Sequence, residues 1–449
     1  MFRIVVLLLQ ASSPSAQAET LPEALAAAVQ ANPHIESARA RLHAIEEGIA
    51  QATAGYLPRV SATADAGYRS DARAWPPTAA GQSPGSGYAL TLSQPLFDGG
   101  RTSSAVQVTQ ANVRAERENV QIALQQVLLA ATTAYMDVVQ NRRLRHLNED
   151  NAALLAQVAV ATRRRAEVRE ATSADLAQAD AAVAGARAQV ALAKANLVMS
   201  EAAFVESVQH PPGVLSRPPA LVDRLPAGLD EALQHAHAVS PAVVLAVERA
   251  AAARHAIDQA NAQLLPSIHL QASYQRRSEP QPGVDDMDGL VAKVVVTVPI
   301  YSGGAGQAEV RAARHTHRAL AWQAADVRAQ VHSAVVQAWA RLQATRAASS
   351  AIAVQVTASR QALAGIRAEQ AVGQRSVLDL ITTQQALLAS RTSHEQNQRN
   401  LVVGCYSLLS AIGRLGPNGS DNPKAAVTPV RDFGMRPSPW TTSVKSGPK

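Results

Sequence analysis

The amino-acid sequence predicts an internally duplicated α+β membrane protein, in which each chain gives four β-strands to a barrel that long α-helical hairpins continue. Three observations support this fold class. A set of short motifs occurs twice in the same order, and two proline-free helical stretches each run for about 60 residues. Four further segments alternate between apolar and polar residues, which is the period of a β-strand.

The composition favours packed helices and excludes several kinds of site. Close to a fifth of the 449 residues are alanine and only 3% are aromatic, which is typical of helices that approach closely through small side chains. The net charge of +7 raises the alternative of a rod-like scaffold that binds nucleic acid. However, the arginines alternate with acids along the helices and form no basic stripe with aromatics, so nucleic acid is not an expected partner. The single cysteine, Cys405, excludes an internal disulfide and a multi-cysteine zinc site.

The first 18 residues have the pattern of an export signal. Arg3 precedes an apolar run at residues 4–9, and Ala16-Gln17-Ala18 provides a small-x-small cleavage site. No later apolar run approaches the 18 residues that a transmembrane helix needs, so none is expected. At the other end, residues 416–449 are rich in Pro, Ser, Thr and Gly and are predicted to be a disordered tail.

Between these ends the chain consists of two copies of one unit. The predicted first repeat is 19–209, the inter-repeat linker 210–228 and the second repeat 229–415. Early landmarks recur at an offset of 208 residues and later ones at 204, so one loop is four residues shorter in the second copy. The recurring pairs are Leu21–Leu25 with Leu229–Leu233, Asn32-Pro33 with Ser240-Pro241, Tyr56–Pro58 with Leu264–Pro266, Gln94–Gly100 with Val298–Gly304, and Thr172–Asp175 with Ser376–Asp379.

Each repeat begins with a helix and continues into two strands. Asn32 and Ser240 are suited to capping free N–H groups, and the proline that follows each one suits the first helical position. The predicted strands lie within 60–68, 88–93, 268–274 and 290–300, where even-numbered positions are mostly apolar and odd-numbered ones more polar. We predict that they are about 9–11 residues long, which is enough to cross a bilayer when tilted.

Each repeat ends in a long helical hairpin. The predicted helices are 103–165 and 172–209 in the first repeat, and 307–368 and 376–413 in the second. Four strands cannot span a membrane alone, because open sheet edges would leave backbone groups unpaired in lipid. Three chains would supply twelve strands, an even number that suits a closed barrel, and the helices would form a second tube beyond it.

The duplicated motifs resemble those of TolC-type outer-membrane channel proteins over residues 20–415. The resemblance rests on the Leu-x-Glu-Ala-Leu…Asn-Pro start, on Pro-Leu-Phe-Asp-Gly-Gly between strand and helix, and above all on Val372–Leu380. It implies a homotrimer in the outer membrane of a Gram-negative bacterium, with a 12-stranded barrel and a large periplasmic helical tunnel. The implied partners are outer-membrane lipid, a periplasmic adaptor (membrane fusion) protein and an inner-membrane ABC transporter or RND-type pump. The motifs look most like those of the type I protein secretion branch; the alternative is the outer-membrane component of a multidrug or small-molecule efflux pump.

The candidate gate residues each have two interpretations. Asp379 follows Ser376 by three residues and Asp175 follows Thr172 by three, a pattern typical of a capping box at a helix start. The resemblance instead makes Asp379 part of an acidic ring at the closed tunnel entrance, where three copies would attract cations and raise one another's pKa. Family members often have a second acid at the position of Thr382, so the ring here is expected to be single. Arg375 is either a solvated arginine or, by resemblance, the basic residue that ties neighbouring hairpins shut, with Asp175 as an acceptor.

The hairpin turns are the implied docking tips for the adaptor. In the second repeat the tip is Val372-Gly373-Gln374, where glycine permits a positive φ. The first repeat has Val168-Arg169 instead. We therefore expect the first tip to dock less readily or to use a different turn.

Other motifs do not indicate chemistry. Gly81–Gly85 matches a nucleophile elbow but lacks a following helix, so we predict a surface loop. His235 and His237 are spaced by two, which points them apart on a helix and argues against a metal site. Asp285–Gly289 lacks the rest of a calcium loop and is predicted to be an exposed loop tip, with cation or lipopolysaccharide contact as an alternative. The sequence thus predicts a passive export duct with no catalytic residue, metal or cofactor, and not an enzyme.

Overall fold

The computed structural model describes residues 18–71, 81–219, 225–281 and 284–416. The predicted signal peptide and the predicted C-terminal tail fall outside the described residues, apart from Ala18 and Gly416. The chain divides into two compact units. One unit contains the described parts of 36–122 and 241–332, and the other contains the rest.

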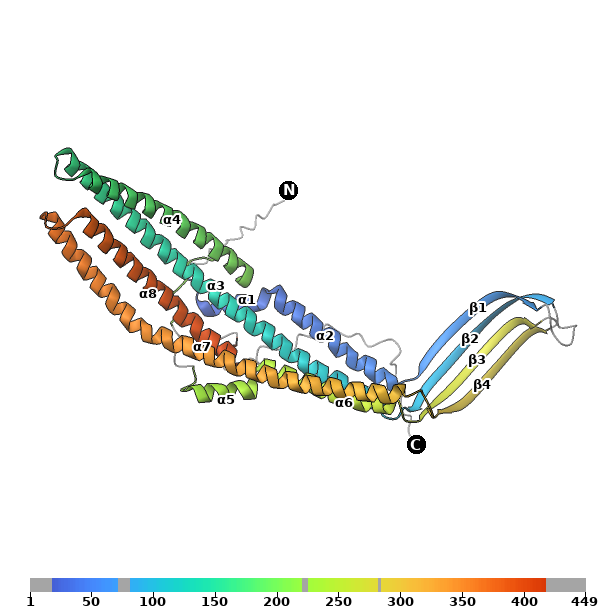
Figure 1. Ribbon diagram of the computed structural model, residues 1–449. Helices are drawn as coiled ribbons and strands as arrows, with labels where there is room; N and C mark the ends of the chain where they lie inside the picture. Colours follow the sequence, from blue (N-terminus) through green and yellow to red (C-terminus); the bar gives the residue numbers. More distant parts are fainter. Residues whose placement is uncertain (1–17, 72–80, 220–224, 282–283, 417–449) are drawn as a thin grey trace, which may run out of the picture. The chain divides into compact units, whose positions relative to one another are not determined.

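Each repeat has the same order of elements, which supports the duplication inferred from the motifs. Both repeats run through two helices, a strand pair and a helical hairpin (Figure 1). The first consists of α1 (Leu21–Ala31), α2 (Pro33–Thr53), the 3-10 turn η1 (Ala54–Tyr56), β1 (Arg59–Asp71), β2 (Gly81–Phe97), α3 (Arg101–Glu167) and α4 (Ser173–Val208). The second consists of α5 (Leu229–Val239), α6 (Pro241–Ala262), β3 (Ser267–Gln281), β4 (Val284–Thr297), α7 (Ala305–Ala371) and α8 (Val377–Ala411).

The helix starts lie where capping chemistry predicts them. Helices α2 and α6 begin at Pro33 and Pro241, one residue after Asn32 and Ser240. The side-chain oxygen of Asn32 accepts a hydrogen bond of 2.9 Å from the backbone N–H of His34, which satisfies one of the free donors of the first turn.

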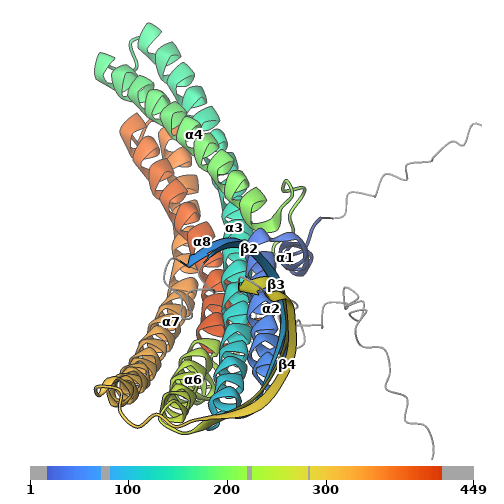
Figure 2. The same cartoon turned by 90° about the vertical axis from the view of Figure 1, so that its right-hand side faces the viewer.

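The four strands form one curved antiparallel sheet in the order β1-β2-β3-β4 (Figure 2). The register places even-numbered residues opposite one another across all four strands, so they share a face. Two adjacent rows on this face are apolar: Ala62, Leu90, Tyr274 and Leu290 in one, and Val60, Leu92, Ala272 and Ala292 in the other. The odd-numbered face carries more polar rows, such as Arg59, Ser93, Gln271 and Lys293. The predicted two-faced sheet is therefore confirmed.

The strands are longer than predicted, at 13 to 17 residues instead of 9–11. Gly81–Gly85 and Asp285–Gly289, which we predicted to be loops, belong to β2 and β4. The apolar rows of the even-numbered face form an apolar band, and the alternation of apolar and polar residues ends with this band. Backbone pairing continues beyond it, as far as Asp71 with Gly81 and Gln281 with Val284. Alternation alone therefore underestimates a strand that extends into a polar region.

Two glycines at each strand-to-helix junction explain the repeated Gly-Gly motif. Gly99 and Gly100 have φ of 68° and 87°, and Gly303 and Gly304 have φ of 63° and 84°. Consecutive residues in the left-handed region are strongly disfavoured for any side chain with a Cβ. Asp98 completes the first junction, because its carboxylate accepts backbone N–H bonds from Gly100 at 3.1 Å and Thr102 at 2.7 Å. Burial raises the pKa of Asp98, but these bonds and the nearby Arg101 outweigh it and hold the pKa below its ordinary value.

Substituting alanine at the two equivalent glycines should have unequal effects. Gly303→Ala should cost about 1–2 kcal/mol for the backbone conformation alone, because its new Cβ meets no atom within 4 Å. Gly99→Ala should cost about 1–3 kcal/mol more, because its Cβ would lie 2.7 Å from Leu265 Cβ and 2.9 Å from Ala262 O. Chemical unfolding of the two variants beside the parent measures the difference. Equal losses would show that the contact around Gly99 relaxes freely.

One of the two longest helices, α3, contains a longer apolar stretch than the sequence analysis expected after the N-terminus. Within the described residues, α3 contains an 18-residue stretch that is long and apolar enough to cross a membrane. However, 61% of that stretch is buried in the protein, as in the core helix of a bundle. Its buried side chains include Leu124, Leu128, Tyr135 and Met136, so packing against neighbouring helices accounts for its apolar character.

Candidate gate and docking tips

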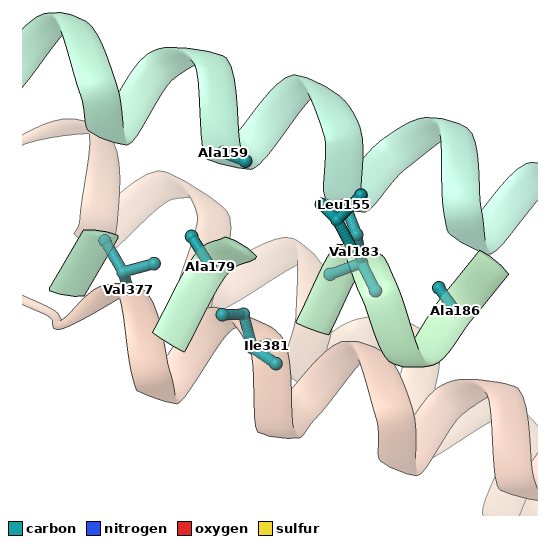
Figure 3. Packing of buried hydrophobic residues seen from close by; sticks show 7 residues of the cluster. All are labelled: Leu155, Ala159, Ala179, Val183, Ala186, Val377 and Ile381. Atoms are coloured by element: carbon teal, nitrogen blue, oxygen red, sulfur yellow. The ribbon is translucent and has the colours of Figure 1, made fainter. Parts of the chain in front are cut away.

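The two helical hairpins, α3 with α4 and α7 with α8, carry all nine residues predicted for the gate and the tips. The described parts of the hairpins that bear these residues lie within one compact unit. Near their turns, α3, α4 and α8 pack through small apolar side chains that point toward one another (Figure 3). This cluster consists of Leu155, Ala159, Ala179, Val183, Ala186, Val377 and Ile381. Alanine at three of these positions lets the helices approach closely.

A buried hydrogen bond also ties the two hairpins together. Gln384 Nε2 on α8 donates to Asn151 Oδ1 on α3 at 3.0 Å, and both residues are buried. A polar pair in an apolar contact favours one alignment of the helices, because a shifted alignment would leave buried polar groups unpaired. The bond therefore joins the two hairpins near their ends, and the other polar atom of Gln384, Oε1, is buried without a hydrogen-bond partner among the described residues.

The two hairpin turns have the same backbone geometry, so the alternative of a different turn in the first repeat is wrong, and weaker docking of the first tip stays a prediction. Arg169 has φ of 64° and Gly373, its counterpart at an offset of 204 residues, has φ of 79°. In the first turn the N–H groups of Arg169 and Glu170 donate to the carbonyls of Ala166 and Arg165, at 3.1 and 2.8 Å. In the second turn the matching bonds from Gly373 and Gln374 are 3.1 and 2.9 Å. Both are Schellman-type helix ends, and the first one holds a left-handed arginine at a conformational cost.

Both tips expose an apolar residue beside this turn. Val168 and Val372 occupy equivalent positions and are 65% and 70% exposed. The predicted docking residues are therefore accessible in one chain, and the tips differ mainly in charge. The first has Arg169 and Glu170 where the second has Gly373 and Gln374.

The capping interpretation of Asp175 and Asp379 is confirmed. Asp379 Oδ2 accepts bonds from the Ser376 backbone N–H at 3.1 Å and the Ser376 hydroxyl at 2.9 Å. The Asp379 N–H in turn donates to Ser376 Oγ at 3.1 Å. Thr172 and Asp175 make the same box at the start of α4, so the acids fix the first helical turn directly after each tip.

These bonds lower the pKa of both carboxyl groups. The hydroxyl and backbone N–H of Ser376, with a contribution from Arg375, hold the pKa of Asp379 below its ordinary value of 3.8. The backbone and hydroxyl of Thr172 do the same for Asp175. Within one chain, Asp379 is therefore ionised at neutral pH. The mutual rise in pKa predicted for a ring of three copies would act against this preference.

The lowered pKa predicts a pH-dependent helix start. Because the folded-state pKa lies below the unfolded value, the stabilisation by Asp175 and Asp379 is complete above pH 3.8 and is lost as the pH falls through the folded values. Amide hydrogen exchange in the first turns of α4 and α8, corrected for intrinsic rates, should show full protection well above pH 3.8 and loss of protection as the pH falls below 3.8 through the folded-state pKa values. In Asp379→Asn the α8 response should be much smaller while that of α4 persists. An unchanged response at α8 would contradict the capping role.

Arg375 does not meet Asp175 within one chain. Instead, Arg375 Nε donates to Glu369 Oε2 at 2.7 Å, and this bond raises the pKa of the guanidinium. Glu369 was missed by the sequence analysis. It lies six residues before Arg375, and the turn around Gly373 brings the two together. Both side chains are about half exposed, so Arg375 remains accessible to a second acceptor.

Thr382 takes no part in an ionic link. Its hydroxyl donates to backbone carbonyls one turn earlier, those of Leu378 at 2.9 Å and Asp379 at 3.1 Å. Across the residues that the structure describes, no group of three or more His, Cys, Asp and Glu is placed to hold a metal ion. The arrangement around the tips can hold helix ends together and present charge.

Comparison with known proteins extends this description to both repeats. The profile of the family described as "Outer membrane efflux protein" matches residues 24–208 and 232–414, which correspond to the two repeats. The "Outer membrane efflux protein BepC" of Brucella suis biovar 1 is 32% identical over 409 residues, covering 89% of this chain and 87% of that protein.

Solved structures share the fold at low sequence identity. The CmeC outer membrane channel of Campylobacter jejuni matches with a TM-score of 0.78 at 14% identity, covering 89% of this chain and 86% of CmeC. The outer membrane protein VceC of Vibrio cholerae matches with a TM-score of 0.74 at 17% identity, covering 88% of this chain and 96% of VceC.

Proposed function

Because the chain belongs to the outer membrane efflux protein family, which is a family of channels and not of enzymes, we propose that it forms the outer-membrane duct of a three-part export system. In this system an inner-membrane transporter supplies the energy and a periplasmic adaptor links it to the duct. The duct itself is passive, and its wall only guides the cargo.

The observation that carries the proposal is the sheet with two open edges. Strands β1 and β4 lie at opposite ends of the four-stranded order, and each has one partner within the chain. An unpaired edge in the hydrocarbon region would leave backbone N–H and C=O groups without partners, which costs several kcal/mol for each group. Pairing of β4 with β1 of a neighbouring chain removes both edges. Three chains then close a barrel of twelve strands.

The exposed apolar side chains on the helices support the same assembly. Leu192, Val198 and Met199 on α4 are each more than half exposed, as is Val354 on α7. These residues lie on elements assigned to a periplasmic tunnel, where contact with helices of neighbouring chains would bury them. A single chain leaves them in water.

We propose a protein as the cargo, exported by a type I system with an ABC transporter. The support is the likeness of the start motif and of Val372–Leu380 to that branch of the family. The second candidate is small-molecule efflux with an RND-type pump, which is favoured by the similarity to BepC, an outer membrane efflux protein. The two candidates share one duct and differ in the transporter.

Deletion of the gene from its own host tests the cargo. For type I secretion, the deletion should abolish release of a protein exported by an ABC transporter encoded nearby and leave drug susceptibility close to that of the parent. For efflux, the deletion should increase susceptibility to several unrelated small molecules and leave protein release intact. Complementation with the parent gene should reverse either effect.

A further inference from the structure

A hollow in the sheet lies where its even-numbered face changes from apolar to polar. It has a volume of about 390 Å³. Six of its eight lining residues are even-numbered residues of β1, β2 and β3, and the other two, Asp65 and Gly87, lie between them along β1 and β2. The lining residues are Ala64, Asp65, Ala66, Ser86, Gly87, Tyr88, Arg276 and Ser278.

The register places this hollow just beyond the apolar band. On the helix side of it, the even-numbered face is built from rows such as Leu270 with Val294 and Ile268 with Val296. The next row after Leu90, Tyr274 and Leu290 contains Ala64, Tyr88, Arg276 and Asp288, and the following one contains Ser278 and Asp286. With about 6.6 Å for every two residues along a strand, four tilted rows approach the band of about 25 Å that lipid-facing strands present. The hollow therefore lies at the level of the lipid headgroups, at the end of the sheet where β1 connects to β2 and β3 connects to β4.

Arg276 provides the single arginine or lysine on this face among the described side chains of the sheet. Arg59, Arg277 and Lys293 are odd-numbered and lie on the opposite face. Arg276 Nη2 donates to Asp286 Oδ2 at 2.9 Å, and Ser278 Oγ donates to the other oxygen of the same carboxylate at 2.5 Å. This carboxylate orients the guanidinium and uses one of its five N–H donors, which leaves four for a ligand. The Arg276 side chain is 52% exposed, so a ligand can reach these donors.

The remaining lining leaves room for a sugar ring beside an aromatic side chain. Ala64, Ala66 and Ser86 have small side chains and leave space over β1 and β2. Tyr88 lies between Ala64 and Arg276 in their shared row. Tyr88 stands at the side of this space and is supported by Tyr274, with ring centroids 6.3 Å apart and planes tilted by 52°. An aromatic ring with an apolar face and a polar tip is well suited to a position between hydrocarbon and headgroups.

From these observations we propose that the hollow binds the phosphorylated sugar headgroup of a glycolipid in the outer leaflet. The Arg276 guanidinium donates to the phosphate, and Tyr88 packs against the sugar. Planar, forked N–H donors match the oxygens of a phosphate better than a point charge does. The inference rests on the proposed function, because it requires the even-numbered face of the sheet to face lipid.

The adjacent arginines provide a matched pair of variants. Arg276→Ala removes the proposed phosphate donor. Arg277→Ala removes the same side chain one residue along β3, on the opposite face, where Arg277 pairs with Asp65 at 3.5 Å. The detergent-extracted protein is titrated with diphosphorylated lipid A and with dephosphorylated lipid A, and bound lipid is counted by native mass spectrometry.

The parent and Arg277→Ala should bind diphosphorylated lipid A alike, and Arg276→Ala should bind it about 10- to 100-fold more weakly, as expected for loss of a charge-assisted hydrogen bond. The parent should bind the dephosphorylated lipid about as weakly. Equal binding by Arg276→Ala and the parent, or equal affinity for the two lipids, would overturn the proposal. Arg276→Lys, which keeps the charge, should retain more binding than Arg276→Ala; the reverse order would also overturn it.

The same titration separates this inference from the proposed duct. Arg276→Ala should assemble and conduct like the parent, so a loss of lipid binding with normal conductance supports the site alone. If Arg277→Ala loses the lipid while Arg276→Ala keeps it, the face assignment is reversed and the inference fails together with the proposed orientation of the sheet. If the parent conducts normally but does not bind the lipid, the inference fails and the duct stands.

Discussion

Val294→Arg is expected to destabilise the membrane-inserted protein by about 2–4 kcal/mol per chain, while Val295→Arg should leave its stability nearly unchanged. The two valines are adjacent on β4, and their side chains lie on opposite faces of the sheet. Val294 pairs with Leu270 on the apolar face and is 59% exposed, and Val295 pairs with His269 on the other face. An arginine placed in hydrocarbon loses its hydration, whereas one that faces a water-filled lumen keeps it.

Denaturant titration of the protein folded into lipid vesicles measures this difference. The identical substitution at neighbouring positions serves as its own control for size, charge and strand propensity. Equal losses at both positions would show that the sheet does not separate lipid from water, and a larger loss at Val295 would show that the faces are reversed.

Arg375→Ser is expected to raise the single-channel conductance several-fold without preventing assembly. A tunnel that stays closed at rest needs links between helix ends, and the one cysteine, Cys405, is buried near the other end of α8 and cannot provide a covalent one. We propose that Arg375 reaches an acceptor on a neighbouring hairpin, with Asp175 as the best-placed acid. The Arg375 side chain is exposed enough to do so while it stays bonded to Glu369.

Glu369→Gln is the matched control for this experiment. It removes the negative charge of the partner of Arg375 within the chain and keeps the arginine itself. If Arg375 closes the tunnel between hairpins, Glu369→Gln should conduct like the parent or less, and Arg375→Ser should conduct more. If both variants conduct alike in planar-bilayer recordings, Arg375 serves only its own turn and the gate lies elsewhere.

Asp379→Ala tests the proposed acidic constriction in the same recordings. Removal of three acids from one ring should reduce cation selectivity and block by multivalent cations. Because Asp379 also caps α8, Ser376→Ala is the control: it weakens the cap and keeps the charge. Similar loss of selectivity in both variants would show that helix fraying, and not the charge, is responsible.

Much of the fold was predictable because its signals are local. Capping residues at Asn32 and Ser240, consecutive glycines after β2 and β4, and the alternation within the strands each depend on a few neighbouring residues. The strand ends were not predictable in this way, since the polar segments beyond the apolar band pair through the backbone regardless of side-chain pattern.

Contacts between distant segments were the part that the sequence concealed. Tyr135 is fully buried, and its hydroxyl lies 2.7 Å from the Glu19 carbonyl and 2.6 Å from that of Ser216. It thereby fastens the predicted linker to the start of the first repeat, where Glu19 and Leu215 form a parallel bridge. No periodicity marks such a contact. In the same way, the partner of Arg375 depends on the geometry of its turn. The first repeat has Arg169 where the second has Gly373, so the sequence did not show that the two turns are alike.

The copy number of the extracted protein tests the central claim most directly, because a sheet with edges β1 and β4 cannot cross a bilayer as a single chain. Native mass measurement in a mild detergent should give an assembly of three chains, and dilution of the protein should not convert it to a folded monomer. A stable, folded monomer that still inserts into vesicles and conducts ions would contradict the account.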